Sequence, residues 1–92
     1  MKTYMVGYDL RRPGQDYSSL IDALKAYPNW WHNLDSTWVI KTNDSAVAIR
    51  DNLVRHIDQN DKLLVAALTG ESAWYGFNSD GDSWLSQNIV PA

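Results

Sequence analysis

The chain has 92 residues, no cysteine and a formal net charge of −3 at pH 7. This length accommodates one domain, and the lack of cysteine excludes disulfides, zinc–thiolate sites and thiol catalysis. The acidic balance disfavours a strongly basic nucleic-acid-binding protein, and the N-terminal apolar run is too short for a signal peptide or a membrane span. We therefore expect one cytoplasmic domain without membrane association.

The first two predicted elements are a strand and a helix. Residues 3–10 predict a strand because β-branched and aromatic types dominate, and the arginines and Pro–Gly that follow indicate a turn. The next segment carries apolar residues at helical spacing as far as Tyr27, with Asp16 as the predicted N-cap. Pro28 then ends the predicted helix.

A hairpin, a helix and a strand are predicted next. Residues 29–34 and 37–42 form the hairpin, and residues 43–45 offer N-caps for a helix whose apolar stripe extends to Ile57. Residues 62–68 are apolar on both faces. We expect there a strand that is covered from both sides, although a helical segment fits the same apolar run.

The order strand, helix, strand, strand, helix, strand predicts an α+β fold of the ferredoxin-like, split βαβ type (βαββαβ). Two helices then cover one face of a four-stranded antiparallel sheet, and the other face is bare. We expect residues 1–92 to form a single domain, with its core at about 2–68 and a C-terminal strand and tail at about 73–92. The aromatic run at 73–77 is a candidate extra edge strand, on this sheet or on that of a partner.

The bare face is predicted to carry Met5, Val39 and alternate residues of 63–68. Trp30 and Trp31 point to opposite sides of a strand, so we expect one ring in the core and the other exposed or at an interface. A bare apolar face of this size typically marks an interface. We therefore expect a homodimer closed through this face, with the C-terminal tail as a candidate contact for a further protein partner.

Asp9 is the main candidate functional residue. Alternation along a strand places Met5, Gly7 and Asp9 on the bare face, and Gly7 leaves room there for a metal, a water or a substrate backbone. Arg11 and Arg12 follow directly. The same residues also fit a strand-terminating turn with solvated charges, so both interpretations stay open.

Two other motifs do not have the spacing that a metal site requires. The sequence NSDGDS at 78–83 suggests a calcium loop, but the EF-hand spacing would place the first and last ligands at Gly76 and Gln87, which have no carboxylate. We expect a flexible turn there. His32 and His56 are too far apart in sequence for metal-ligand spacing.

A first strand that ends in Tyr8–Asp9, the arginines after it and the third-strand motif STWVI at 36–40 resemble the small CRISPR-associated Cas-two proteins and their VapD and SinR-like relatives. The resemblance covers roughly residues 1–68. It implies a homodimer joined through its sheet faces. It also implies that the first-strand aspartate takes part in metal-dependent cleavage of nucleic acid, as in some members, or that the protein is a non-catalytic scaffold, as others are.

These observations lead us to expect a homodimeric Cas-two-like protein that binds RNA or DNA and acts, with magnesium, as an endonuclease or endoribonuclease. Asp9 is the expected catalytic residue and metal ligand, and Arg11, Arg12 and Lys41 are the expected contacts to nucleic acid. A hard cation needs several oxygen ligands, so both copies of Asp9 would have to share it. The alternative is a non-catalytic dimeric interaction or scaffold module, of a CRISPR-adaptation, toxin–antitoxin or phage-borne kind, in which Asp9 is structural.

Overall fold

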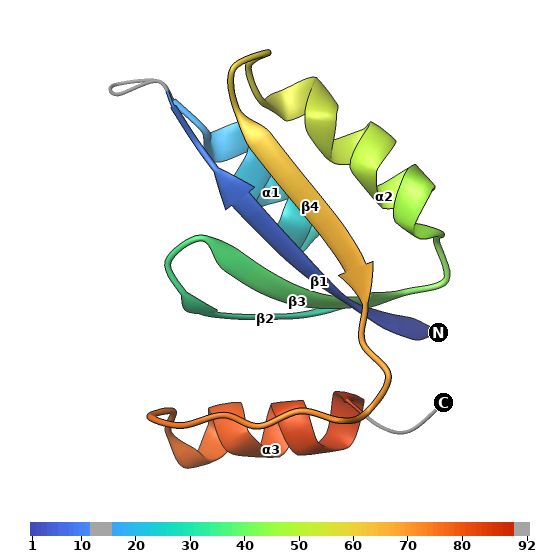
Figure 1. Ribbon diagram of the computed structural model, residues 1–92, viewed down its shortest axis with the longest axis vertical. Coiled ribbons are helices and arrows are strands. Elements are labelled where there is room, and N and C mark those ends of the chain that lie inside the picture. Colours follow the sequence, from blue (N-terminus) through green and yellow to red (C-terminus); the bar gives the residue numbers. More distant parts are fainter. Residues whose placement is uncertain (12–15, 90–92) are drawn as a thin grey trace.

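A computed structural model describes residues 1–11 and 16–89, which form a four-stranded antiparallel sheet and three α-helices (Figure 1). The strands are β1 (Lys2–Asp9), β2 (Asn29–Leu34), β3 (Thr37–Thr42) and β4 (Lys62–Ala67), and the helices are α1 (Ser18–Lys25), α2 (Ala46–Leu53) and α3 (Ser79–Asn88). A 3-10 turn, Val54–His56, follows α2. The strand order β2–β3–β1–β4 puts β1 and β3 in the centre of the sheet. The predicted small α+β fold is confirmed, and its arrangement is compatible with a ferredoxin-like fold.

Helix α1 begins close to the predicted position. Tyr17 occupies the N-cap position, one residue after the predicted Asp16. The Asp16 carboxylate accepts a hydrogen bond from the backbone N–H of Ser18 at 2.9 Å. Together with a hydrogen bond from the Ser18 hydroxyl, this bond holds the pKa of Asp16 below its ordinary value. Leu20 and Leu24 point from α1 into the core.

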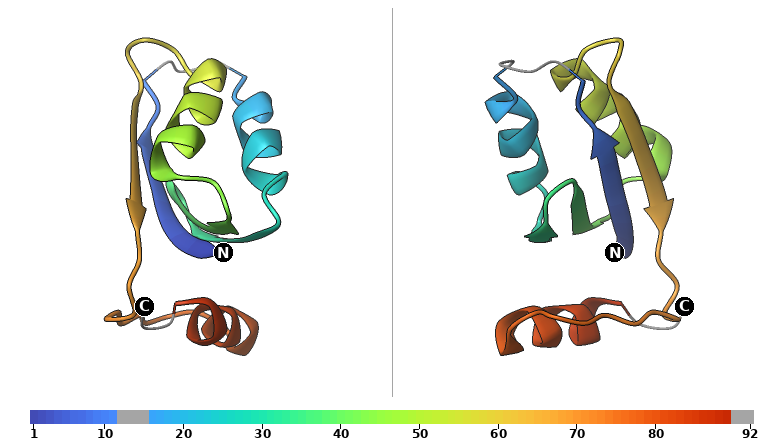
Figure 2. Two further views of the ribbon diagram at one scale, coloured as in Figure 1. Left: turned by 90° about the vertical axis from the view of Figure 1, so that its right-hand side faces the viewer. Right: turned by 60° about the vertical axis from the view of Figure 1, so that its left-hand side comes forward.

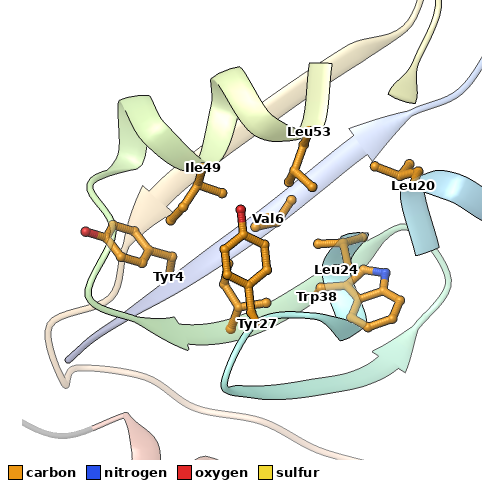
Figure 3. Close-up of a cluster of buried hydrophobic side chains, with 9 residues drawn as sticks. Tyr4, Val6, Leu20, Leu24, Tyr27, Trp38, Ile49 and Leu53 are labelled. Atoms are coloured by element: carbon orange, nitrogen blue, oxygen red, sulfur yellow. The ribbon is translucent and has the colours of Figure 1, made fainter. Parts of the chain in front are cut away.

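Helix α2 begins where the sequence indicates. The Ser45 hydroxyl accepts a hydrogen bond from the N–H of Ala48 at 3.1 Å, which satisfies one of the free donors of the first turn. Ile49 and Leu53, one turn apart, are fully buried. Figure 3 shows both side chains reaching from α2 toward the sheet.

The main core lies between the sheet and helices α1 and α2, which cover the same face (Figures 1 and 2). Trp38 is fully buried there; its Nε1–H donates to the Tyr8 hydroxyl at 3.1 Å, and its ring stacks on His32 with centroids 3.9 Å apart. Burial also raises the pKa of Tyr27 above its ordinary value. The buried members of this core are Tyr4, Val6, Leu20, Leu24, Tyr27, Trp38, Ile40, Ile49 and Leu53.

The C-terminal residues correct two predictions. Residues 73–77 do not form an edge strand but run without regular structure, and residues 78–83 begin α3 instead of forming a flexible turn. Asn78 is the N-cap of α3, since its side-chain oxygen accepts from the N–H of Gly81 at 2.8 Å. Asp80 and Asp82 lie in the first turn, where the helix dipole favours negative charge.

Only one half of the helix-free face of the sheet is covered, and the covering segment belongs to the same chain. Buried Trp31, Val39 and Leu85 pack together where α3 and the preceding segment lie over β2 and β3. In Figure 2 this segment sits apart from α1 and α2, and nothing among the described elements lies over the helix-free side of β4. Within one chain, β4 is therefore covered on one side only, because Leu64 is 60% exposed while Leu63 packs against the core.

Candidate functional site

Asp9 is the last residue of β1 and forms an ion pair with Arg11. Its Oδ2 atom accepts from Arg11 Nε at 2.9 Å and lies 2.8 Å from Arg11 Nη2. Both side chains are more than half exposed. Asp9 also lies opposite Lys62 in the β1–β4 register. The structure thus brings Asp9 and Arg11 together, while Arg12, the third residue predicted there, lies outside the described residues.

Asp61 fixes the backbone at this strand end, and the sequence did not single it out. Its Oδ1 atom accepts from the backbone N–H of Arg11 at 2.7 Å. Its Oδ2 atom accepts from the Tyr17 hydroxyl at 2.9 Å and from the N–H of Asp58 at 2.8 Å. One carboxylate therefore connects the second residue after β1, the start of α1 and the turn before β4. The available signal was its place in a polar turn, where aspartates commonly bond to nearby backbone.

Lys41 lies far from this strand end. It pairs with Thr3 in the β1–β3 register, six residues before Asp9 along β1. A strand rises about 3.3 Å per residue, so the two positions are roughly 20 Å apart. The Lys41 ammonium lies 3.3 Å from the side-chain oxygen of Asn88 in α3. Lys41 and Asp9 therefore do not form one compact site within a chain.

Gly7 leaves open space on the same side of β1 as Asp9. A Cβ atom at Gly7 would meet nothing within 4 Å among the described residues. Its register partners are Thr37 on β3 and Leu64 on β4. The room that the sequence predicted beside Asp9 is therefore present.

An apolar hollow of about 240 Å³ separates the sheet from the C-terminal segment. Most of its lining is apolar, with Thr37 and Ser72 as polar contributors. Two large apolar side chains at its rim are exposed: Leu34 by 46% and Tyr75 by 97%. The lining also includes Met5, Trp31, Val39, Ala73 and Phe77. The sequence does not indicate this hollow, because it depends on where residues 69–89 pack.

Hydrogen bonds hold α3 to the sheet. The Thr3 hydroxyl donates to the carbonyl oxygen of Asn88 at 2.6 Å in a buried position. The Trp84 Nε1–H donates to the side-chain oxygen of Asn29 at 2.9 Å. These contacts connect α3 to β1 and β2 and hold it over the covered half of the helix-free face.

The described residues of one chain do not form a metal-binding cluster. Among residues 1–11 and 16–89, no group of three or more His, Cys, Asp or Glu side chains could hold a metal ion. Asp9 offers one carboxylate, and Arg11 already bonds to it. Magnesium takes near-octahedral oxygen ligands, and among the described residues Asp9 supplies only one carboxylate toward them.

Comparison of the chain with protein-family models, curated proteins and solved structures finds no match. Within the described part of the chain, no helix is long and apolar enough to cross a membrane. The features available for a functional argument are therefore the ion pair at the end of β1 and the partly covered sheet face.

Proposed function

We propose that this protein is a homodimeric, Cas-two-like nucleic-acid-binding module with a ferredoxin-like fold. In this proposal the helix-free face joins the two copies, and the end of β1 contacts phosphate groups. The observation that carries the proposal is the open half of that face, where Leu64 is 60% exposed and Gly7 leaves space beside Asp9. An exposed apolar sheet face favours assembly with a partner surface over a solvated one.

Arg11 is the residue that would bind phosphate. A guanidinium has five N–H donors, and the ion pair with Asp9 engages Nε and Nη2, which leaves donors for a phosphate oxygen. Asp9 then acts as a positioning residue that holds the guanidinium. Lys62, the register partner of Asp9, adds a second positive residue at this end of the sheet. Because the chain carries a net charge of −3, we expect weak binding that salt weakens further.

A binding assay tests this role of Arg11. We expect Arg11→Gln to weaken binding to fluorescently labelled single-stranded RNA or DNA by about tenfold and to lower the salt dependence between roughly 50 and 200 mM. Arg50→Gln is the matched control, because Arg50 is also exposed and pairs with a neighbouring aspartate, Asp51, on α2. Equal losses in both variants, or no binding by the wild type, would contradict the proposal.

A magnesium-dependent endonuclease or endoribonuclease is the second candidate. The open space beside Asp9 favours it, and a two-fold dimer would present two copies of Asp9. Bound magnesium would supply an activated water or charge neutralisation at phosphate. This candidate therefore requires the dimer. Asp9 would also have to give up its ion pair with Arg11 in order to bind the metal.

Cleavage of labelled RNA and DNA with and without magnesium separates the two candidates. If Asp9 is a ligand, Asp9→Asn abolishes metal-dependent cleavage and leaves the dimer intact. Cleavage by this variant at the wild-type rate would reject a catalytic role for Asp9. A wild type that binds without cleaving favours the non-catalytic scaffold.

A further inference from the structure

Tyr75 is fully presented to solvent, although its neighbours are fixed to the protein. Its relative exposure is 97%. The preceding Trp74 donates its Nε1–H to Asp82 on α3 at 3.1 Å, and Phe77 packs edge-to-face on Trp31 with ring centroids 4.8 Å apart. Gly76, between them, has φ +93°, a conformation that L side chains rarely adopt. The contacts of Trp74 and Phe77 therefore attach the segment to the protein on both sides of Tyr75, while the Tyr75 ring itself stays exposed.

The apolar hollow next to Tyr75 has the size and chemistry for one aromatic side chain. Its volume of about 240 Å³ lies below the range of drug-sized ligand pockets, which begins at about 300 Å³. Met5, Val39 and Phe77 contribute apolar walls, and the described lining residues carry no charge. Thr37 adds a hydroxyl that can pair with a phenol, as buried tyrosines require.

We infer that Tyr75 is the anchor of the homodimer, with each copy inserting this side chain into the apolar hollow of the other. The inference rests on the proposed homodimer and places its contact at the hollow, which borders the open half of the helix-free face because its lining residue Thr37 is the register partner of Gly7. A two-fold interface is self-complementary, so a protruding group and a hollow on the same surface are both used twice. One chain carries both features side by side, which makes a second copy of this chain the occupant that matches them.

The expected area of this contact reaches the lower limit for a specific dimer. A buried tyrosine removes about 150–250 Å² from solvent, and the hollow that receives it loses a similar area. Two such insertions account for roughly 800 Å², and the exposed Leu34 at the rim of each hollow brings the total toward the ~1,000 Å² of a specific interface. We therefore expect a dimer of modest affinity in which Tyr75 dominates the binding energy.

Sedimentation equilibrium of the full chain tests this inference. The wild type should approach twice the chain mass of 10.5 kDa as concentration rises. Tyr75→Ala should raise the dimer dissociation constant about 30-fold or more, as loss of a central interface tyrosine does. Tyr75→Phe, which keeps the ring, should stay within about fivefold of the wild type. The control is Val47→Ala, an exposed position on α2, which should change nothing.

A mixing experiment tests the pairing of Tyr75 with the hollow. Thr37→Arg introduces a charge into the hollow and leaves Tyr75 in place. Each of Thr37→Arg and Tyr75→Ala should be monomeric alone, but their mixture should form a heterodimer with one intact tyrosine–hollow contact. Far-UV circular dichroism and thermal melting establish that both variants are folded.

The outcomes separate this inference from the proposed function. A wild type that stays monomeric overturns both the homodimer and the anchor. A Tyr75→Ala protein that dimerises like the wild type leaves the homodimer standing and overturns the anchor. A mixture of the two variants that stays monomeric likewise overturns the anchor. Binding of a different protein at the hollow, without any dimer of this chain there, also overturns it.

Discussion

The two sides of the sheet are closed by different means. On one side, two helices contribute Leu20, Leu24, Ile49 and Leu53 to a core that excludes solvent. On the other side, α3 contributes a single fully apolar buried side chain, Leu85, together with bonds from polar groups to the strands. The first side is closed mainly by hydrophobic burial, and the second by a small cluster that covers half the face. The comparison shows that a helix can pack on one half of a sheet face and leave the other half exposed.

The largest expected effect comes from shortening leucines on the two sides. We expect Leu24→Ala to lower the free energy of unfolding by about 3–5 kcal/mol, because Leu24 is fully buried in the main core. Leu85→Ala should cost about 2–3 kcal/mol, since it removes the same atoms from a smaller cluster that can relax. Urea denaturation of both variants measures the two values.

The control for this pair is Leu64→Ala, measured at protein concentrations where the chain is monomeric. Leu64 is 60% exposed, so the change should stay within about 0.5 kcal/mol. If Leu85→Ala is as harmless as Leu64→Ala, then α3 does not close the second side. If Leu85→Ala costs as much as Leu24→Ala, the two sides are equally well packed and the comparison fails.

A smaller effect is expected from the polar contacts of the second side. Thr3→Val keeps the shape of the side chain but removes the buried hydrogen bond to the carbonyl of Asn88, which should cost about 1–2 kcal/mol. Amide hydrogen exchange should accelerate within α3 and remain unchanged in α1 and α2. Thr37→Val, on the same face but outside this contact, provides the control at protein concentrations where the chain is monomeric. Unchanged protection of α3 would show that the bond does not hold the helix.

The sequence predicted the first part of the fold because burial there is one-sided and regular. Ile49 and Leu53 repeat at helical spacing, and the Ser45 cap marks the start of their helix. The C-terminal segment lacks such a period, since α3 buries little apolar surface. Its start signals were nevertheless present, in Asn78 at the N-cap and Asp80 in the first turn. The same residues also resemble a calcium loop, and a run of Asn, Ser, Asp and Gly favours a turn as well as a helix start.

The candidate site was predictable only where it depends on a single strand. Alternation along β1 places Gly7 and Asp9 on the helix-free side, and Arg11 is near in sequence. Lys41 and Asp61 depend on the register of other elements, which one strand does not determine. The sequence therefore indicated the carboxylate, but not the residues that lie around it.

The bond between Thr3 and Asn88 has a consequence for folding of the chain. It joins residues 85 positions apart, so the second side of the sheet cannot close until α3 has packed against the first strand. The four strands and the helices α1 and α2 enclose the main core without α3. A partly folded chain at that stage presents Trp31 and Val39, which pack with Leu85 in the folded protein, on an uncovered sheet. Such a chain is open to association with other chains, because transiently exposed apolar surface and strands promote aggregation during folding.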